Sequence, residues 1–108
     1  MRYVIDIDGT ICHHKNPDSP YEDSIPIKKR IDLINKLYDD NHHVTYFTAR
    51  GMGRHSNNAE LAEKEFRGLT ERQLKEWKCK YHELFLGKPS GDIYIDDKGI
   101  KDEEFFRD

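Results

Sequence analysis

Acidic side chains follow two short apolar runs of this chain. Asp6 and Asp8 lie within and directly after the run at residues 3–7, and Asp96 and Asp97 follow the run at residues 93–95. Four carboxylates crowded together repel one another unless a cation lies among them. Oxygen ligands favour a hard ion, and Mg²⁺ is a common choice. If the fold brings the two pairs together, the sequence predicts a magnesium site.

The spacing of Asp6 and Asp8 suits phosphoryl transfer. In an extended strand, residues two apart point to the same side. One carboxylate can attack phosphorus and form an aspartyl-phosphate, while the other transfers the proton of the leaving group. A cation, a lysine, a hydroxyl and backbone N–H groups can stabilise the charge on the phosphoryl oxygens. Thr48 and Lys88 offer the hydroxyl and the lysine at the ends of two further apolar runs.

Both acids have a second interpretation as simple turn formers after a strand. Burying two acids on either side of the apolar Ile7 costs free energy, and a simple turn gives no reason for that cost. We therefore prefer the catalytic interpretation of Asp6 and Asp8.

Strands alternating with helices must position these side chains. Short β-branched and aromatic runs predict strands at residues 3–7, 43–48, 84–86 and 92–95. Polar stretches with proline or glycine predict loops at residues 12–24 and 51–58.

Helices are predicted between the second and third strands and before the second. Apolar residues at three- and four-residue spacing predict a helix over 27–38, with Pro26 in its first turn and Ser24 as its N-cap. Asn58 is expected to cap a helix over 59–66 that stops at Gly68. The capping box that begins at Thr70 predicts the start of a separate third helix.

This order predicts an α/β fold: a three-layer Rossmann-like domain with a central, mainly parallel sheet. The 108 residues suffice for a single domain, 1–108, and leave no mass for a separate cap domain. Ligands of such sheets bind outside the carboxyl ends of the strands. The side chains that end the four strands are therefore expected to converge.

The same residues resemble the four motifs of the haloacid dehalogenase-like (HAD) superfamily, in the family's order and over nearly the whole chain. The segment at residues 6–10 (Asp-Ile-Asp-Gly-Thr) is similar to the first motif, Thr48 to the second, Lys88 to the third and residues 93–97 to the fourth. Residues 47–51, 70–77 and 87–98 also resemble small bacterial and phage proteins labelled as capsular-polysaccharide or hypothetical phosphatases. These are of the capless type.

The resemblance implies a role for each position. Asp6 would be the nucleophile and a magnesium ligand, and Asp8 the general acid and then the base that activates water. An acid at position 8 separates phosphoesterases and mutases of this superfamily from dehalogenases. The remaining implied roles are phosphate binding by Thr48, Ala49 and Lys88, and binding of Mg²⁺ by Asp96 and Asp97 together with Asp6 and Asp8.

Two further residues are candidates for contact with the substrate. Arg50 follows the second strand, where it either contacts the substrate phosphate or faces solvent, and His13 follows the first motif. Arg54 and His55 lie in the polar loop after the second strand, where surface charge is the commoner explanation.

Composition and charge exclude several classes of function. The net charge of −3 offers no general attraction for nucleic acid or an anionic membrane. No stretch approaches the ~20 apolar residues of a membrane span. Cys12 and Cys79 have no metal-ligand spacing and suit a reducing cytoplasm, and no signal peptide is recognised.

Together these features predict a Mg²⁺-dependent phosphomonoesterase that acts on a small phosphorylated metabolite such as a sugar phosphate. A polynucleotide end phosphatase and a non-catalytic phosphate-binding module remain alternatives. Without a cap, the site is either open or closed by a neighbouring subunit, so homo-oligomerisation is a reasonable expectation.

Overall fold

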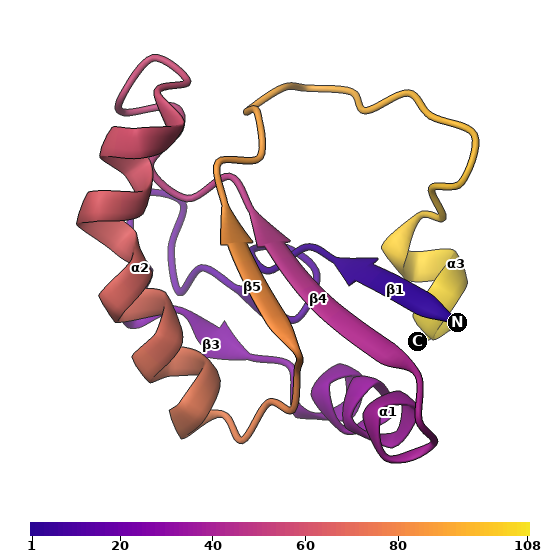
Figure 1. Cartoon of the computed structure of the whole chain (residues 1–108). Coiled ribbons are helices and arrows are strands. Elements are labelled where there is room, and N and C mark those ends of the chain that lie inside the picture. The colour runs from indigo at the N-terminus through magenta and orange to yellow at the C-terminus, as the bar shows by residue number, and fades with distance from the viewer.

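Three parallel strands form the sheet in a computed structural model that describes residues 1–108 (Figure 1). The strand order is β1 (Arg2–Ile5), β4 (His43–Thr48) and β5 (Glu83–Leu86). Ile5 is in register with Tyr46, and Thr48 with Leu86. The carboxyl ends of all three strands therefore meet at one edge of the sheet, and the strands predicted at these positions are confirmed.

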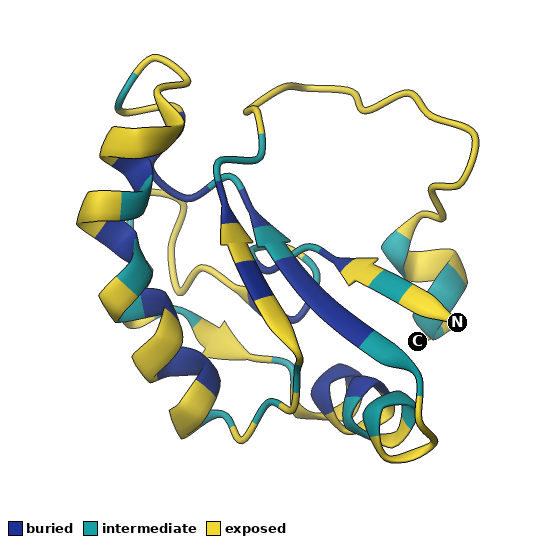
Figure 2. Cartoon of the chain, viewed as in Figure 1, coloured by how far each residue is buried: buried dark blue, intermediate teal, exposed yellow.

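The central strand β4 lies at the centre of the hydrophobic core (Figure 2). Val44 and Tyr46 are fully buried on it, which fits a strand with neighbours on both sides. The twelve buried core residues are Ile5, Ile7, Ile11, Cys12, Ile31, Ile34, Val44, Tyr46, Phe66, Leu74, Leu84 and Leu86.

Helix α1 (Lys28–Asp39) packs against β4 and buries Ile31 and Ile34. The predicted range of this helix, 27–38, agrees with α1 to within one residue, but the predicted N-cap, Ser24, lies three residues before the observed N-cap, Ile27. Residues Ile25–Pro26 form a short strand, β3, which pairs antiparallel with β2 (Cys12–His13), and Ser24 makes no capping hydrogen bond to the helix. The extended pairing keeps this segment out of the helix.

Helix α2 (Ala59–Glu76) runs beside β5 as one continuous helix, so the prediction of two helices was wrong. Asn58 caps its start as predicted, by accepting a hydrogen bond from the Leu61 N–H. Thr70 caps nothing: it is buried, and its hydroxyl donates to the carbonyl one turn earlier. Apolar side chains on both sides of Gly68 face the same core, and their burial outweighs the cost of about 1 kcal/mol for a helical glycine.

The segment after β5 contains the largest departure from the predicted fold. No strand forms at residues 92–95, where Ile93 is 78% and Ile95 is 92% exposed. The segment arcs away from the sheet before the C-terminal helix α3 (Asp102–Phe106) (Figure 1). It leaves β1 as an edge strand, with Val4 67% exposed.

The C-terminal end of the chain is attached through Arg30 of α1. Its guanidinium donates hydrogen bonds to the carboxylates of Asp102 and Asp108 and lies over the ring of Phe106. A further hydrogen bond, to the carbonyl of Thr10 at 3.0 Å, joins this cluster to the turn after β1. No helix of the molecule has the length and apolar character that a membrane crossing requires.

Candidate active site

A pocket of about 380 Å³ lies at the carboxyl edge of the sheet. Six predicted residues from three separate segments line it: Asp6, Asp8, Thr48, Ala49, Arg50 and Lys88. The parallel register explains this convergence, because each residue lies at or just beyond the end of a strand. The other lining residues are His14, Tyr21, Gly53, Arg54, Ser90 and Tyr94. His13 is not among them, and its exposed side chain lies on β2.

Asp6 is held from two sides. The Thr10 hydroxyl donates to one carboxylate oxygen at 3.1 Å, and the Lys88 ammonium lies 3.5 Å from the other. Gly9, with φ of 85°, turns the chain so that Thr10 returns to Asp6. Burial raises the pKa of Asp6, while Lys88 and Thr10 act in the opposite direction. A further cation beside this carboxylate would favour its charged, nucleophilic form.

Lys88 has a second contact besides Asp6. Its ammonium lies 4.4 Å from the centroid of the Tyr94 ring, in cation–π geometry. Its backbone N–H donates to the Thr48 carbonyl at 3.2 Å. Lys88 is thereby fixed by backbone and side chain at the point where β5 leaves the sheet.

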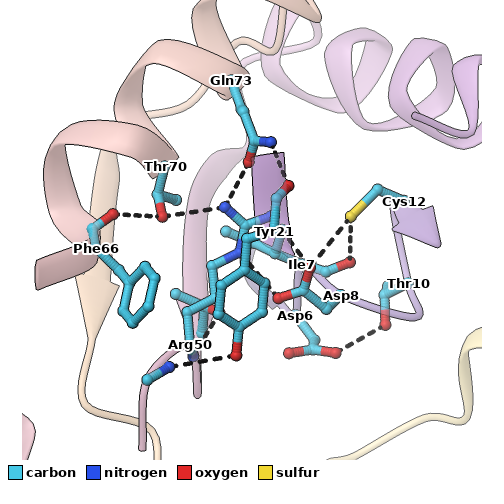
Figure 3. A network of polar contacts seen from close by, with 12 residues as sticks. Asp6, Ile7, Asp8, Thr10, Cys12, Tyr21, Arg50, Phe66, Thr70 and Gln73 are labelled. Atoms are coloured by element: carbon cyan, nitrogen blue, oxygen red, sulfur yellow. Dashed lines mark hydrogen bonds and ion pairs between the residues drawn. The ribbon is translucent and has the colours of Figure 1, made fainter. Parts of the chain in front are cut away.

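Asp8 forms a two-point ion pair with Arg50, at 2.9 and 3.1 Å (Figure 3). The Arg50 side chain is completely buried, whereas the Asp8 side chain retains 21% exposure toward the pocket. A fork–fork pair of this kind fixes both the position and the plane of the carboxylate. Of the two alternatives for Arg50, exposure to solvent is therefore wrong, and its N–H groups are largely occupied within the protein.

Arg50 is itself held by three side chains of other elements (Figure 3). It donates to the Thr70 hydroxyl at 3.2 Å and to the side-chain carbonyl of Gln73, both on α2. Its guanidinium lies 4.9 Å from the centroid of the Tyr21 ring. Gln73 in turn donates to the Tyr21 backbone carbonyl. The short 3-10 helix Tyr21–Asp23 before β3 and helix α2 thus share one buried polar network around Asp8.

Sequence reasoning missed the roles of Tyr21, Thr70 and Gln73. The motif at Thr70 was interpreted as a helix start, which concealed its position on the buried side of a longer helix. A usable signal was present, because Thr70 and Gln73 lie on the apolar side of the helix between Phe66 and Leu74. A polar pair on such a side needs buried partners.

Thr48 is placed to bind an acceptor. Its side chain is buried at the end of β4, and its oxygen accepts the Arg50 backbone N–H at 3.1 Å. The Thr48 hydroxyl has no acceptor in the protein, so its proton is available to an oxygen in the pocket.

Asp96 and Asp97 do not line this pocket. Asp96 accepts the backbone N–H groups of Lys98, at 2.7 Å, and Gly99, and these hydrogen bonds lower its pKa. Asp97 pairs with Lys98 on the surface. No group of three or more His, Cys, Asp or Glu side chains is placed so that it could hold a metal ion. The predicted ligand set is not assembled, because the strand that should deliver Asp96 and Asp97 is absent.

Comparison with known proteins gives the fold alone. No protein-family model matches the chain, and no curated protein is significantly similar to it. The crystal structure of a structural-genomics target from Vibrio cholerae matches with a TM-score of 0.87 and 23% identity, covering 97% of this chain and 86% of that one. The chain therefore shares its α/β architecture, over nearly its whole length, with that Vibrio cholerae protein.

Proposed function

We propose that the chain is a capless HAD-like phosphatase: a Mg²⁺-dependent phosphomonoesterase that acts on a small phosphorylated metabolite such as a sugar phosphate. One observation carries the proposal. Asp6 and Asp8 share a single pocket with the Thr48 hydroxyl and the Lys88 ammonium, although these groups come from three different strand ends. Nucleophile, proton carrier and phosphate ligands are the components that hydrolysis through a phospho-enzyme requires.

In the proposed reaction, an Asp6 carboxylate oxygen attacks phosphorus as the bond to the leaving-group oxygen breaks. Asp8 supplies the proton that this oxygen takes, and then accepts a proton from the water that attacks the aspartyl-phosphate. Inorganic phosphate leaves and Asp6 is regenerated. The Lys88 ammonium and the Thr48 hydroxyl stabilise the negative charge on the phosphoryl oxygens in both steps. Arg50 contributes by fixing the Asp8 carboxylate in one orientation.

Magnesium is part of this proposal, but the residues as placed do not form its site. Only Asp6 and Asp8 offer carboxylates in the pocket, and Arg50 already occupies Asp8. The proposal therefore includes a rearrangement in which residues 92–95 pair with the free edge of β1 and carry Asp96 toward Asp6. The three-layer Rossmann-like fold with this additional strand belongs to the same proposal. The exposed apolar side chains of Val4, Ile93 and Ile95 support it, because pairing would bury them.

The experiment is a phosphate-release assay on a broad panel of phosphate esters, with p-nitrophenyl phosphate as the general probe. Asp6→Asn should abolish turnover, and Asp8→Asn should lower it by about 10²–10⁴-fold, the range for a lost general acid. Intact folding of each variant is checked by circular dichroism. A folded wild-type protein that turns over no ester would favour the phosphate-binding module. Preference for a nicked DNA 3′-phosphate would replace the small-metabolite substrate.

A second set of assays tests the requirement for Mg²⁺. Activity should disappear with EDTA and return with Mg²⁺. Asp96→Asn should raise the Mg²⁺ concentration needed for half-maximal activity, whereas Asp92→Asn, in the same exposed segment, should leave it unchanged. Equal effects of the two substitutions would refute the rearrangement while leaving phosphatase activity to be judged on Asp6.

A further inference from the structure

A second hollow, of about 790 Å³, adjoins the candidate active site. It lies between residues 17–22 and the side of α2 that carries residues 64–72. Three residues, His14, Tyr21 and Arg54, line both spaces. The two spaces are therefore neighbours along a common wall, and the larger one plays no part in the proposed handling of the phosphoryl group.

The common wall lies on the Asp8 side of the active site. Tyr21 packs against Arg50, which holds Asp8, so the proton carrier and the wall of the hollow belong to one rigid cluster. Asp6 and Lys88 pair with each other, and neither makes a side-chain hydrogen bond or ion pair to this cluster. A phosphate ester whose leaving oxygen faces Asp8 would direct the rest of its leaving group toward the hollow.

The lining of the hollow indicates what it would bind. Two cations, Lys64 and Arg72, and two anions, Asp18 and Glu22, line it without a hydrogen bond or ion pair to any other protein side chain. The further acid, Glu65, is already paired with Arg54 at 2.8 Å. Donors and acceptors are thus balanced.

A balanced lining of this kind selects among leaving groups. A strand of nucleic acid would meet carboxylates as well as cations, so it gains no net attraction. An acyl chain would leave these polar groups without partners. An uncharged leaving group with many hydroxyls can donate to the acids and accept from the bases.

We propose that this hollow is the leaving-group site and that it takes the polyhydroxylated, uncharged sugar of a sugar phosphate. The inference rests on the proposed phosphatase activity and adds to it the residues that select the substrate. Recognition of the sugar depends on Lys64, Arg72, Asp18 and Glu22, none of which touches the phosphoryl group.

Gly68 provides a clean test. It lies in the middle of α2 and lines the hollow, and a Cβ added there would come no closer than 3.5 Å to another side chain, that of Arg72. Gly68→Trp should therefore fill the hollow while the helix is kept, since tryptophan is a better helix former than glycine by about 0.5 kcal/mol. Gly68→Ala is the matched control, because it changes the backbone propensity but adds a single methyl group.

Three probes separate the hollow from the chemistry: acetyl phosphate, which needs only the smaller pocket, glucose 6-phosphate and trehalose 6-phosphate. The wild-type protein should prefer the sugar esters in kcat/KM. Gly68→Trp should lower kcat/KM for the sugar esters by at least about tenfold, mainly through KM, while acetyl phosphate changes by less than about twofold. Gly68→Ala should leave all three probes unchanged.

Each outcome decides one question. A wild-type protein without preference for the sugar esters, or a Gly68→Trp variant impaired equally on all probes, would overturn the assignment of the hollow while acetyl phosphate turnover still supports the phosphatase. If no probe is turned over by folded protein, the proposed function fails and the leaving-group site fails with it.

Discussion

Replacing Arg50 by methionine should destabilise the protein more than any other arginine substitution at the pocket. The Arg50 side chain is completely buried and donates to Asp8, Thr70 and Gln73. Methionine retains part of the volume but removes the charge and every donor. The Asp8 carboxylate would then remain half-buried without its cation.

The magnitude follows from these contacts. Breaking a buried ion pair by removing one partner costs about 3–5 kcal/mol. The lower end applies here, because Asp8 is 21% exposed and water can reach it. Loss of the donors to Thr70 and Gln73 adds about 1 kcal/mol. The total of roughly 4 kcal/mol is a large part of a stability of about 5–15 kcal/mol, and it corresponds to a fall in Tm of roughly 15 °C in a domain of this size.

The assay is urea and thermal unfolding followed by circular dichroism. Arg54→Met is the matched control, since that arginine is 64% exposed and its pair with Glu65 is at the surface. Its loss should cost less than about 1 kcal/mol. The double variant Arg50→Met/Asp8→Asn should lose about 2 kcal/mol less free energy of unfolding than the two single variants together, because it leaves no unpaired charge. An Arg50→Met variant within about 1 kcal/mol of wild type, or strict additivity, would refute the role of this pair.

Three further predictions concern the backbone, a thiol and the C-terminal end. Gly51→Ala should destabilise by about 2–4 kcal/mol in urea unfolding, because Gly51 has φ of 78° and a Cβ would lie 2.5 Å from an aromatic ring of α2. Gly53→Ala, which meets no atom within 4 Å, should be close to neutral, and equal effects would contradict the argument. Burial raises the pKa of the Cys12 thiol to about 12. Alkylation of Cys12 in the native protein at pH 8, followed by mass spectrometry, should therefore be at least about a hundredfold slower than that of a free thiol. Hydrogen bonds from Arg30 hold the pKa of Asp102 below its usual value, so this stabilisation is complete above about pH 4 and is lost at lower pH. Arg30→Met should therefore lower the Tm more at pH 7 than at pH 3, and a difference independent of pH would count against the pair.

The part of the site that local pattern could predict is the part at strand ends. Asp6, Thr48 and Lys88 were expected together because parallel strands present their carboxyl ends at one edge, and the pocket contains all three. This inference needs only the identity of each strand and the residue that ends it. Both are encoded over a few neighbouring residues.

Two predictions failed because a local signal competed with packing. The capping box at Thr70 predicts a helix start, but the core stripe extends from Ala62 to Leu74 and keeps a single helix through Gly68. The run at residues 92–95 has strand composition, yet a strand also needs a partner edge, and the segment makes no such pairing in this structure.

Asp6 and Asp8 show what the sequence alone determines and what depends on the tertiary structure. The sequence by itself determined that Asp6 and Asp8 follow a strand and lie close to each other. Only the tertiary structure decided their different partners: Lys88 and Thr10 for Asp6, and the buried Arg50 for Asp8. The Asp8–Arg50 pair spans 42 residues and depends on α2 and Tyr21 to hold the arginine. Contacts of that kind arise from packing between distant segments, which no local spacing records.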